Sequence, residues 1–210
     1  MIKRGRFITL EGGEGAGKST QIKRLAAWLE LAGITVVTTR EPGGSPEAEE
    51  IRSLLVDQSN RAWDGIAEAL LVNTARHMHV RDTILPALDS GAWVLCDRFY
   101  DSTTAYQGYG RGVDLAVLDQ LRRIAIDTLE PDLTIILDVD VQTGLTRAME
   151  RRGGETRFEQ AGLAFHARLR AGFQALAATE PQRCVLIDAN RSIEAIEASI
   201  QHLIERQFHL

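Results

Sequence analysis

The sequence predicts an α/β protein with a doubly wound, five-stranded parallel sheet flanked by helices. Short apolar runs alternate along the chain with stretches whose apolar residues recur at helical spacing. The runs lack the polar alternation of a half-exposed sheet, which indicates strands covered on both faces. The expected strands span residues 6–10, 34–38, 92–96, 133–137 and 184–187.

The segments between these runs supply the expected crossover helices. After the first run, apolar residues recur three and four positions apart from Ile22 to Leu29, and the pattern stops at Ala32–Gly33. A second such segment runs from Leu115 to Ile124. In doubly wound sheets, ligands bind beyond the carboxyl ends of the strands, so we expect the site there.

Length and charge limit the kind of protein. A chain of 210 residues suits one domain, taken here as residues 1–210. The net charge of -5 argues against a polynucleotide partner, because such proteins usually carry a basic excess. No apolar run approaches the roughly 20 residues of a membrane span, so we expect no membrane partner and a cytoplasmic location. Cys96 and Cys184 lie in apolar runs and are expected to be buried free thiols.

The first expected strand leads into a phosphate-binding motif. Residues 11–20 read EGGEGAGKST, which fits G-x-x-x-x-G-K-[ST] between a strand and a helix. Backbone N–H groups of such a loop converge on phosphate oxygens, so the motif predicts an ATP site. We expect Lys18 to reach the β- and γ-phosphates, Ser19 to bind Mg²⁺ and Thr20 to contact the α-phosphate. The predicted ATP-binding residues are Gly12, Gly13, Glu14, Gly15, Ala16, Gly17, Lys18, Ser19 and Thr20.

The loop alone does not fix the class of enzyme. A GTPase needs a guanine-reading Asn-Lys-x-Asp motif, and no lysine follows Lys23. An ATP-driven motor or a shikimate- or adenylate-type kinase stays open at this point. Asp97 and Arg98 follow the third expected strand, where Asp97 can bind Mg²⁺ through water or orient its ligands and Arg98 can bridge donor and acceptor phosphates.

Four segments in this order closely resemble bacterial thymidylate kinases: residues 11–20, 39–44, 97–103 and 105–112. The resemblance extends over nearly the whole chain. It implies transfer of the γ-phosphoryl group of ATP to dTMP, giving dTDP and ADP, with Mg²⁺ as cofactor. It also implies a homodimer.

The resemblance assigns roles to individual residues. Glu14 matches the acidic residue that faces the deoxyribose 3′-hydroxyl, and Arg40 matches the loop after the second strand, where Pro42 carries an unusual peptide geometry. Arg52 and Arg98 match the pair that clamps the dTMP phosphate. The implied base-reading residues are Arg76, at the thymine carbonyl, and Thr103 and Gln107, at the base edge.

Two features bear on catalysis and specificity. Residues 147–159 match a short mobile lid, and with Gly15 in the loop, Arg151 and Arg152 are the implied source of the charge that stabilises the transferring phosphoryl group. Val72 departs from the family, which usually has an aromatic residue there that stacks on thymine. Either the dTMP site is weaker, or the pocket accepts another pyrimidine deoxynucleotide. A non-catalytic ATP-binding regulator is the remaining alternative.

Overall fold

The computed structural model describes residues 4–56, 63–150 and 161–210. Its five strands pair in parallel in the order β2-β3-β1-β4-β5, which confirms the predicted fold class. The second strand begins at Val36, two residues later than predicted. The strands are β1 (Phe7–Glu11), β2 (Val36–Arg40), β3 (Trp93–Asp97), β4 (Leu133–Asp138) and β5 (Cys184–Asp188).

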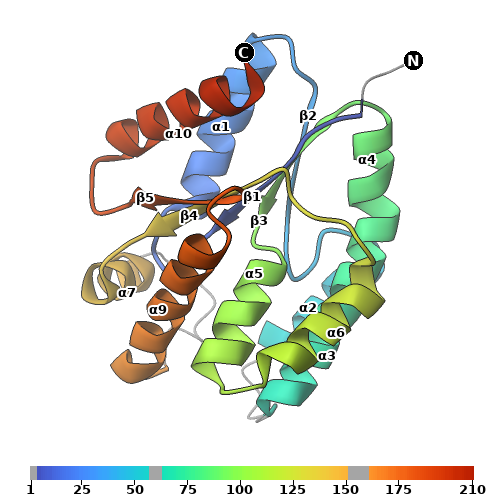
Figure 1. The fold of residues 1–210 in the computed structure, drawn as a ribbon, viewed down its shortest axis with the longest axis vertical. Coiled ribbons are helices and arrows are strands. Elements are labelled where there is room, and N and C mark those ends of the chain that lie inside the picture. The colour runs from blue at the N-terminus through green and yellow to red at the C-terminus, as the bar shows by residue number, and fades with distance from the viewer. Residues whose placement is uncertain (1–3, 57–62, 151–160) are drawn as a thin grey trace.

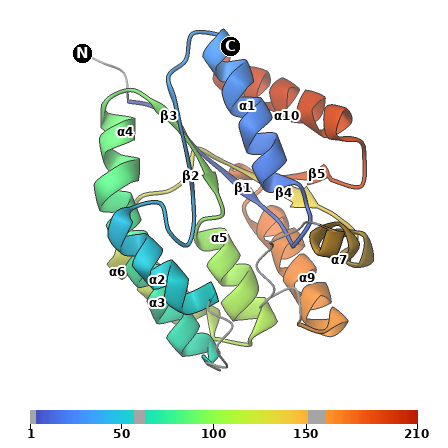
Figure 2. The same cartoon turned by 180° about the vertical axis from the view of Figure 1, so that it is seen from behind.

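Helices cover both faces of the sheet (Figures 1 and 2). On one face, α1 (Lys18–Leu31) and α10 (Ile193–Phe208) pack against inward-facing residues such as Ile8 and Leu10 of β1. On the other face, Phe7 of β1 joins a cluster with η1 (Val80–Ile84), α4 (Leu85–Asp89) and α6 (Leu115–Ile126). Because successive residues of a strand point to opposite faces, a continuous apolar run serves both layers.

The strand order reverses at β1, which lies between β3 and β4. Crossovers therefore depart in opposite directions there and leave a crevice at the carboxyl ends of the strands. Three segments approach this edge: the start of α1, the short helix α5 (Tyr100–Thr103) and its π-helical continuation η2 (Thr104–Gly110) (Figure 1). The remaining helices are α2 (Pro46–Val56), α3 (Gly65–His79), α7 (Val141–Glu150) and α9 (Leu163–Thr179).

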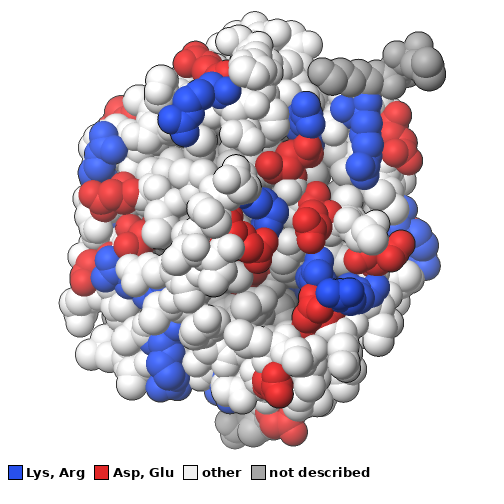
Figure 3. Space-filling model, viewed as in Figure 1, with Lys and Arg blue, Asp and Glu red and all other residues white. Residues whose placement is uncertain are grey.

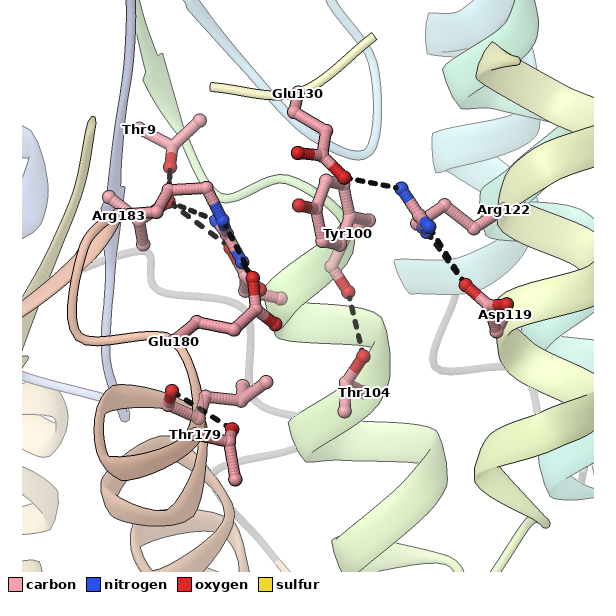
Figure 4. Close-up of polar contacts among 12 residues, drawn as sticks. Thr9, Tyr100, Thr104, Asp119, Arg122, Glu130, Thr179, Glu180 and Arg183 are labelled. Atoms are coloured by element: carbon pink, nitrogen blue, oxygen red, sulfur yellow. Dashed lines mark hydrogen bonds and ion pairs between the residues drawn. The ribbon is translucent and has the colours of Figure 1, made fainter. Parts of the chain in front are cut away.

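Buried polar contacts hold one face of helix α5 in place (Figure 4). Arg183 donates two hydrogen bonds to the fully buried Asp101, at 2.6 and 2.9 Å, and pairs with Glu180 at 2.8 Å. The Tyr100 ring lies between the guanidinium groups of Arg122 and Arg183, whose Cζ atoms are 5.0 and 5.1 Å from its centroid. These contacts tie α5 to α6 and to the start of β5, so its opposite face can carry the site on a rigid support.

The expectation for the two cysteines is met in the part of the chain that the structure describes. Cys96 and Cys184 are free and buried. None of the described helices is long and apolar enough to cross a membrane.

Candidate active site

The phosphate loop joins the carboxyl end of β1 to the start of α1, at the point where the strand order reverses. Gly15 has φ 66°, and a Cβ built there would lie 1.9 Å from the carbonyl oxygen of Gly144. Gly12 has φ 134°, and its Cβ would lie 2.5 Å from the Leu137 carbonyl oxygen. Only glycine tolerates both the backbone conformation and the contact. A catalytic side chain at position 15 is therefore excluded unless α7 moves.

Lys18, the first residue of α1, folds back over the loop. Its ammonium group donates to the carbonyl oxygens of Gly12 and Gly13, both at 3.0 Å, and its side chain is buried. Burial and the nearby Arg98 charge lower the pKa of Lys18 to about 8. Anionic phosphate oxygens would favour the charged form. The lysine is thus held above the loop, where a nucleotide's phosphates would bind.

Ser19 and Asp97 meet although they are far apart in the sequence. The Ser19 hydroxyl donates to Asp97 Oδ2 at 2.7 Å, because α1 starts beside the carboxyl end of β3. A hydroxyl and a single carboxylate suit Mg²⁺, which keeps several waters and takes its other ligands from phosphates. The described residues include no cluster of three or more His, Cys, Asp or Glu, the donor set that a fully protein-bound metal would use. The pair fits the predicted magnesium site.

Arg98 links the phosphate loop to α5. Its backbone has φ 71°, and its guanidinium donates to the Gly12 carbonyl oxygen at 3.1 Å, to the Ser102 hydroxyl at 3.3 Å and to Glu14 at 3.0 Å. It also stacks on Tyr106, with Cζ 4.8 Å from the ring centroid. A left-handed non-glycine residue is uncommon and needs such support from its surroundings.

Glu14 receives a second contact from η2. The Tyr106 hydroxyl donates to Glu14 Oε1 at 2.5 Å. Burial alone would raise the pKa of Glu14, but the charges of Arg98 and Lys18 and the Tyr106 hydrogen bond outweigh it and hold the pKa at about 2. Glu14 is therefore ionised at neutral pH and can accept a hydrogen bond from a substrate hydroxyl.

A second carboxylate, Glu11, lies beneath the loop and fixes the start of α5. It is fully buried and accepts from the Phe99 backbone N–H at 2.6 Å and from the Ser102 hydroxyl at 2.5 Å. Burial and the neighbouring Asp101 charge raise the pKa of Glu11 to about 8. Because Phe99 follows Arg98 directly, these bonds help to orient the Arg98 side chain.

Arg76 connects α3 to the loop after β2 and to α5. It is buried and donates to Glu41 at 2.7 Å, to Asn73 at 3.0 Å and to Thr103 at 3.0 Å. Glu41 also accepts from His79 Nδ1 at 3.0 Å. The structure therefore brings together two of the three predicted base-reading residues, Arg76 and Thr103, and the third, Gln107, lies one turn beyond Thr103.

Comparison with known proteins decides the family. A sequence profile of the family described as thymidylate kinase matches residues 10–200. A thymidylate kinase of Bradyrhizobium sp. is 57% identical over 195 residues, which are 92% of this chain and 86% of that protein. One of Caulobacter vibrioides is 50% identical over 209 residues and covers 100% of both chains. The crystal structure of thymidylate kinase from Ehrlichia chaffeensis superposes with a TM-score of 0.76 at 37% identity, covering 96% of this chain and 99% of that one.

The chain belongs to the thymidylate kinase family. It is an enzyme of the nucleoside monophosphate kinase class. As a thymidylate kinase it phosphorylates dTMP to dTDP, with ATP as the phosphate donor.

The other predicted residues of this thymidylate kinase lie nearby, with their substrate roles still to be tested. Arg40 is largely exposed and pairs with Glu49 at 3.2 Å, and Arg52 donates to the Pro42 carbonyl oxygen at 2.5 Å. The Glu41–Pro42 peptide bond is cis, as the resemblance implied. Val72 is half-buried on α3, one turn before Arg76.

The predicted lid divides at Glu150. Residues 147–150 form the last turn of α7, where Arg147 donates to the Ala189 carbonyl oxygen at 2.8 Å. The rest of the segment, with Arg151 and Arg152, lies outside the described residues. Their assignment to the transition state stays a prediction.

Sequence reasoning gave no role to Glu11, Tyr106 or Ser102. Each lies within a quoted motif: Glu11 directly precedes the first loop glycine, Ser102 belongs to the third segment and Tyr106 to the fourth. Their position within a motif is a sequence signal that could have marked these three residues as candidates. Which of these side chains would face Arg98 and Glu14 depended on the docking of α5 against β1.

Proposed function

We propose that this site positions ATP and dTMP on either side of Arg98 and transfers the γ-phosphoryl group directly between them. The observation that carries the proposal is the position of Arg98, whose guanidinium contacts both the phosphate loop at Gly12 and the nucleoside-side acceptor Glu14. A planar, permanently charged fork in that place can contact phosphates from both substrates.

The residues needed for this reaction neutralise charge and hold geometry. The acceptor oxygen of dTMP is already ionised at neutral pH, so no general base is required, and in-line positioning with charge stabilisation suffices. Lys18 would bind the β- and γ-phosphates, and Arg98 would orient the acceptor phosphate together with Arg52. Ser19 and Asp97 would hold Mg²⁺, which when bound neutralises the charge of the phosphate oxygens.

Glu14 and the α3 residues would hold the nucleoside. An ionised Glu14 would accept the 3′-hydroxyl hydrogen bond that distinguishes a nucleotide with a free 3′ position. Arg76, Thr103 and Gln107 would bind the base edge, with Val72 as an apolar wall. Arg40 would complete the phosphate end of the site.

Arg151 and Arg152 are proposed to supply the remaining positive charge when the lid closes. The close approach of Gly15 to Gly144 supports placing this charge outside the phosphate loop, because it leaves no room for an arginine in the loop. Single replacement of each arginine by alanine should lower kcat more than it changes KM for either substrate, because the interaction is strongest in the transition state. Full kcat in both single variants and in the double variant would contradict the assignment.

A panel of phosphate acceptors tests the proposal. We expect dTMP to give the highest kcat/KM among dTMP, dUMP, dCMP, dGMP, UMP and 5-substituted dUMPs, with ATP and Mg²⁺. Val72 makes a second candidate worth including, since a smaller wall suits a pyrimidine with a larger 5-substituent. A 5-substituted dUMP that clearly exceeds dTMP would establish that alternative, and no release of ADP with any of the acceptors would favour a non-catalytic ATP-binding regulator.

We also propose that two copies pair through α3 and α6. These helices lie side by side, joined by a 2.8 Å hydrogen bond from His77 Nδ1 to the Ala125 carbonyl oxygen (Figure 2). Their outer surface exposes large apolar side chains: Ile66, Leu70, Val117 and Ile124. Ile124 is 79% exposed, an unusual position for an isoleucine unless it is covered by a partner. Light scattering should give a dimer, and Ile124→Asp should shift it toward monomer.

Small-molecule substrates are the partners of this enzyme, and we propose that it works in the cytoplasm without binding polynucleotides. On the face in Figure 3, basic and acidic residues are intermixed. Such a surface differs from the continuous basic area that binds nucleic-acid backbone. Filter binding of single- and double-stranded DNA at low salt is the direct check.

A further inference from the structure

Glu68 is a buried carboxylate that the reaction described above does not use. It lies in the first turn of α3, is 0% exposed, and is the only acidic residue of that turn. One oxygen, Oε2, accepts from Gln107 Nε2 at 3.0 Å, and the other, Oε1, accepts from Arg111 Nη2 at 3.1 Å. Buried carboxylates are rare without a specific partner, so the contact with Gln107 needs an explanation.

The contact fixes which way the Gln107 amide points. A carboxylate can only accept hydrogen bonds, so it must face the NH₂ group of the amide and not its oxygen. Gln107 is 3% exposed, and no described residue donates to its Oε1 atom. The Oε1 atom is therefore the end of the amide that can accept a hydrogen bond from a ligand.

The free oxygen lies in the predicted base-binding region. Glu68, Val72 and Arg76 follow one another at intervals of four residues on the same face of α3. Gln107 and Thr103 are also four residues apart, on α5 and η2. Two contacts therefore bridge the same pair of segments, Arg76 to Thr103 and Glu68 to Gln107, with Val72 between them on α3.

We propose that Glu68 is a specificity-determining residue: by holding the Gln107 amide with its oxygen toward the base, it selects pyrimidines that carry an N3–H group. Thymine and uracil donate at N3, whereas cytosine has an acceptor there. An acceptor fixed opposite another acceptor leaves both unpaired, and an unpaired buried polar group disfavours binding of that base. Glu68 acts through Gln107 and is a positioning residue. The inference rests on the proposed role of Gln107 at the base edge.

The test compares kcat/KM for dTMP and dCMP in wild-type enzyme and in Glu68→Gln. A glutamine at position 68 can face either end of the Gln107 amide, so the amide is free to turn. We expect the dTMP to dCMP ratio to fall roughly tenfold, the worth of about one hydrogen bond. Arg111→Met is the matched control, because it removes a different contact of Glu68, the one with Arg111. It should lower thermal stability while leaving the ratio unchanged.

The experiment gives a different result if Glu68 has only a structural role. Glu68→Gln would then lower kcat/KM for both nucleotides equally, and an unchanged ratio would overturn the inference. If Glu68→Gln does not fold, the exchange variant Glu68→Gln/Gln107→Glu decides, since it keeps one carboxylate and one amide and restores a fixed acceptor at position 107. A ratio near that of wild type supports the inference, and a low ratio overturns it. Wild-type enzyme without a preference for dTMP over dCMP would overturn the proposed function as well.

Discussion

The phosphate loop and the α3 face hold their ligand-facing groups in different ways. In the loop, Lys18 is held by carbonyl oxygens of residues five and six positions away, and the shape comes from glycines. On α3, Arg76 is held by Glu41 and Thr103, which are 35 and 27 positions distant. The loop binds a charge pattern common to all nucleotides, and its backbone shape comes mainly from local geometry. The α3 face must recognise one base, and its polar groups are locked by partners from separate elements.

This difference predicts that changes in the loop reduce catalysis with little effect on folding, whereas changes on α3 affect both. Lys18→Ala should show the largest loss of activity. Removing a charge contact to the transferring group typically costs about 10²- to 10³-fold in kcat. A coupled ADP-release assay measures the rate, and thermal unfolding should give a midpoint close to that of wild type. Near-normal turnover would remove Lys18 from the mechanism.

Arg76→Ala should reduce stability as well as dTMP binding. The change leaves Glu41, which is 5% exposed, with the His79 ring as its remaining described side-chain partner. Breaking a buried ion pair costs about 3–5 kcal/mol, and we expect a value near the low end because His79 stays in place. Urea denaturation measures the loss in the free energy of unfolding.

Arg40→Ala is the control for Arg76→Ala, because Arg40 also pairs with a glutamate but in solvent. Its side chain is 56% exposed and that of Glu49 is 41% exposed. Surface pairs contribute about 0–1 kcal/mol, so this variant should unfold nearly as wild type does. Equal losses of stability in the two variants would show that burial does not distinguish the regions.

Glu11 lies where the two regions join, and its protonation should make stability depend on pH. With its pKa raised to about 8 from an ordinary value of 4.5, the folded protein retains a proton that the unfolded chain releases. Stability from this group is complete below about pH 4.5 and is lost as pH rises toward 8. Between pH 5.5 and 8, wild type should therefore lose roughly 3 kcal/mol more than Glu11→Gln does. Parallel pH profiles from urea denaturation of the two proteins would refute this.

Val72→Phe should produce the smallest effect. It tests the α3 face alone, because residue 72 is expected to contact the base. An aromatic side chain can stack on thymine, which contributes about 1 kcal/mol, so KM for dTMP should fall up to about fivefold. Lys18-dependent steps should be unaffected, and kcat should stay near the wild-type value. Steady-state kinetics with dTMP and dUMP would measure the change. A higher KM for both would indicate that the added ring fills space the base needs.

The phosphate loop was also easier to predict from the sequence than the contacts of the α3 face. The strands and the phosphate loop are short-range features: apolar runs specify strands buried on both faces, and G-x-x-x-x-G-K-[ST] specifies the loop within ten residues. The family resemblance added Arg76, Thr103 and Gln107 as candidates. Their substrate roles remain predictions, but Arg76 and Thr103 do lie in contact.

The sequence by itself determined the fold class, the phosphate loop, the family and the identity of the candidate residues. Tertiary structure decided which of their polar atoms are available. The Gln107 amide could point either way until α3 placed Glu68 beside it, and Arg98 became a link between loop and nucleoside side because α5 docks on Glu11. Such contacts join residues up to 92 positions apart, as in Tyr106 and Glu14. No local pattern encodes them, since the packing of separate elements fixes both the direction of each hydrogen bond and the groups left for a ligand.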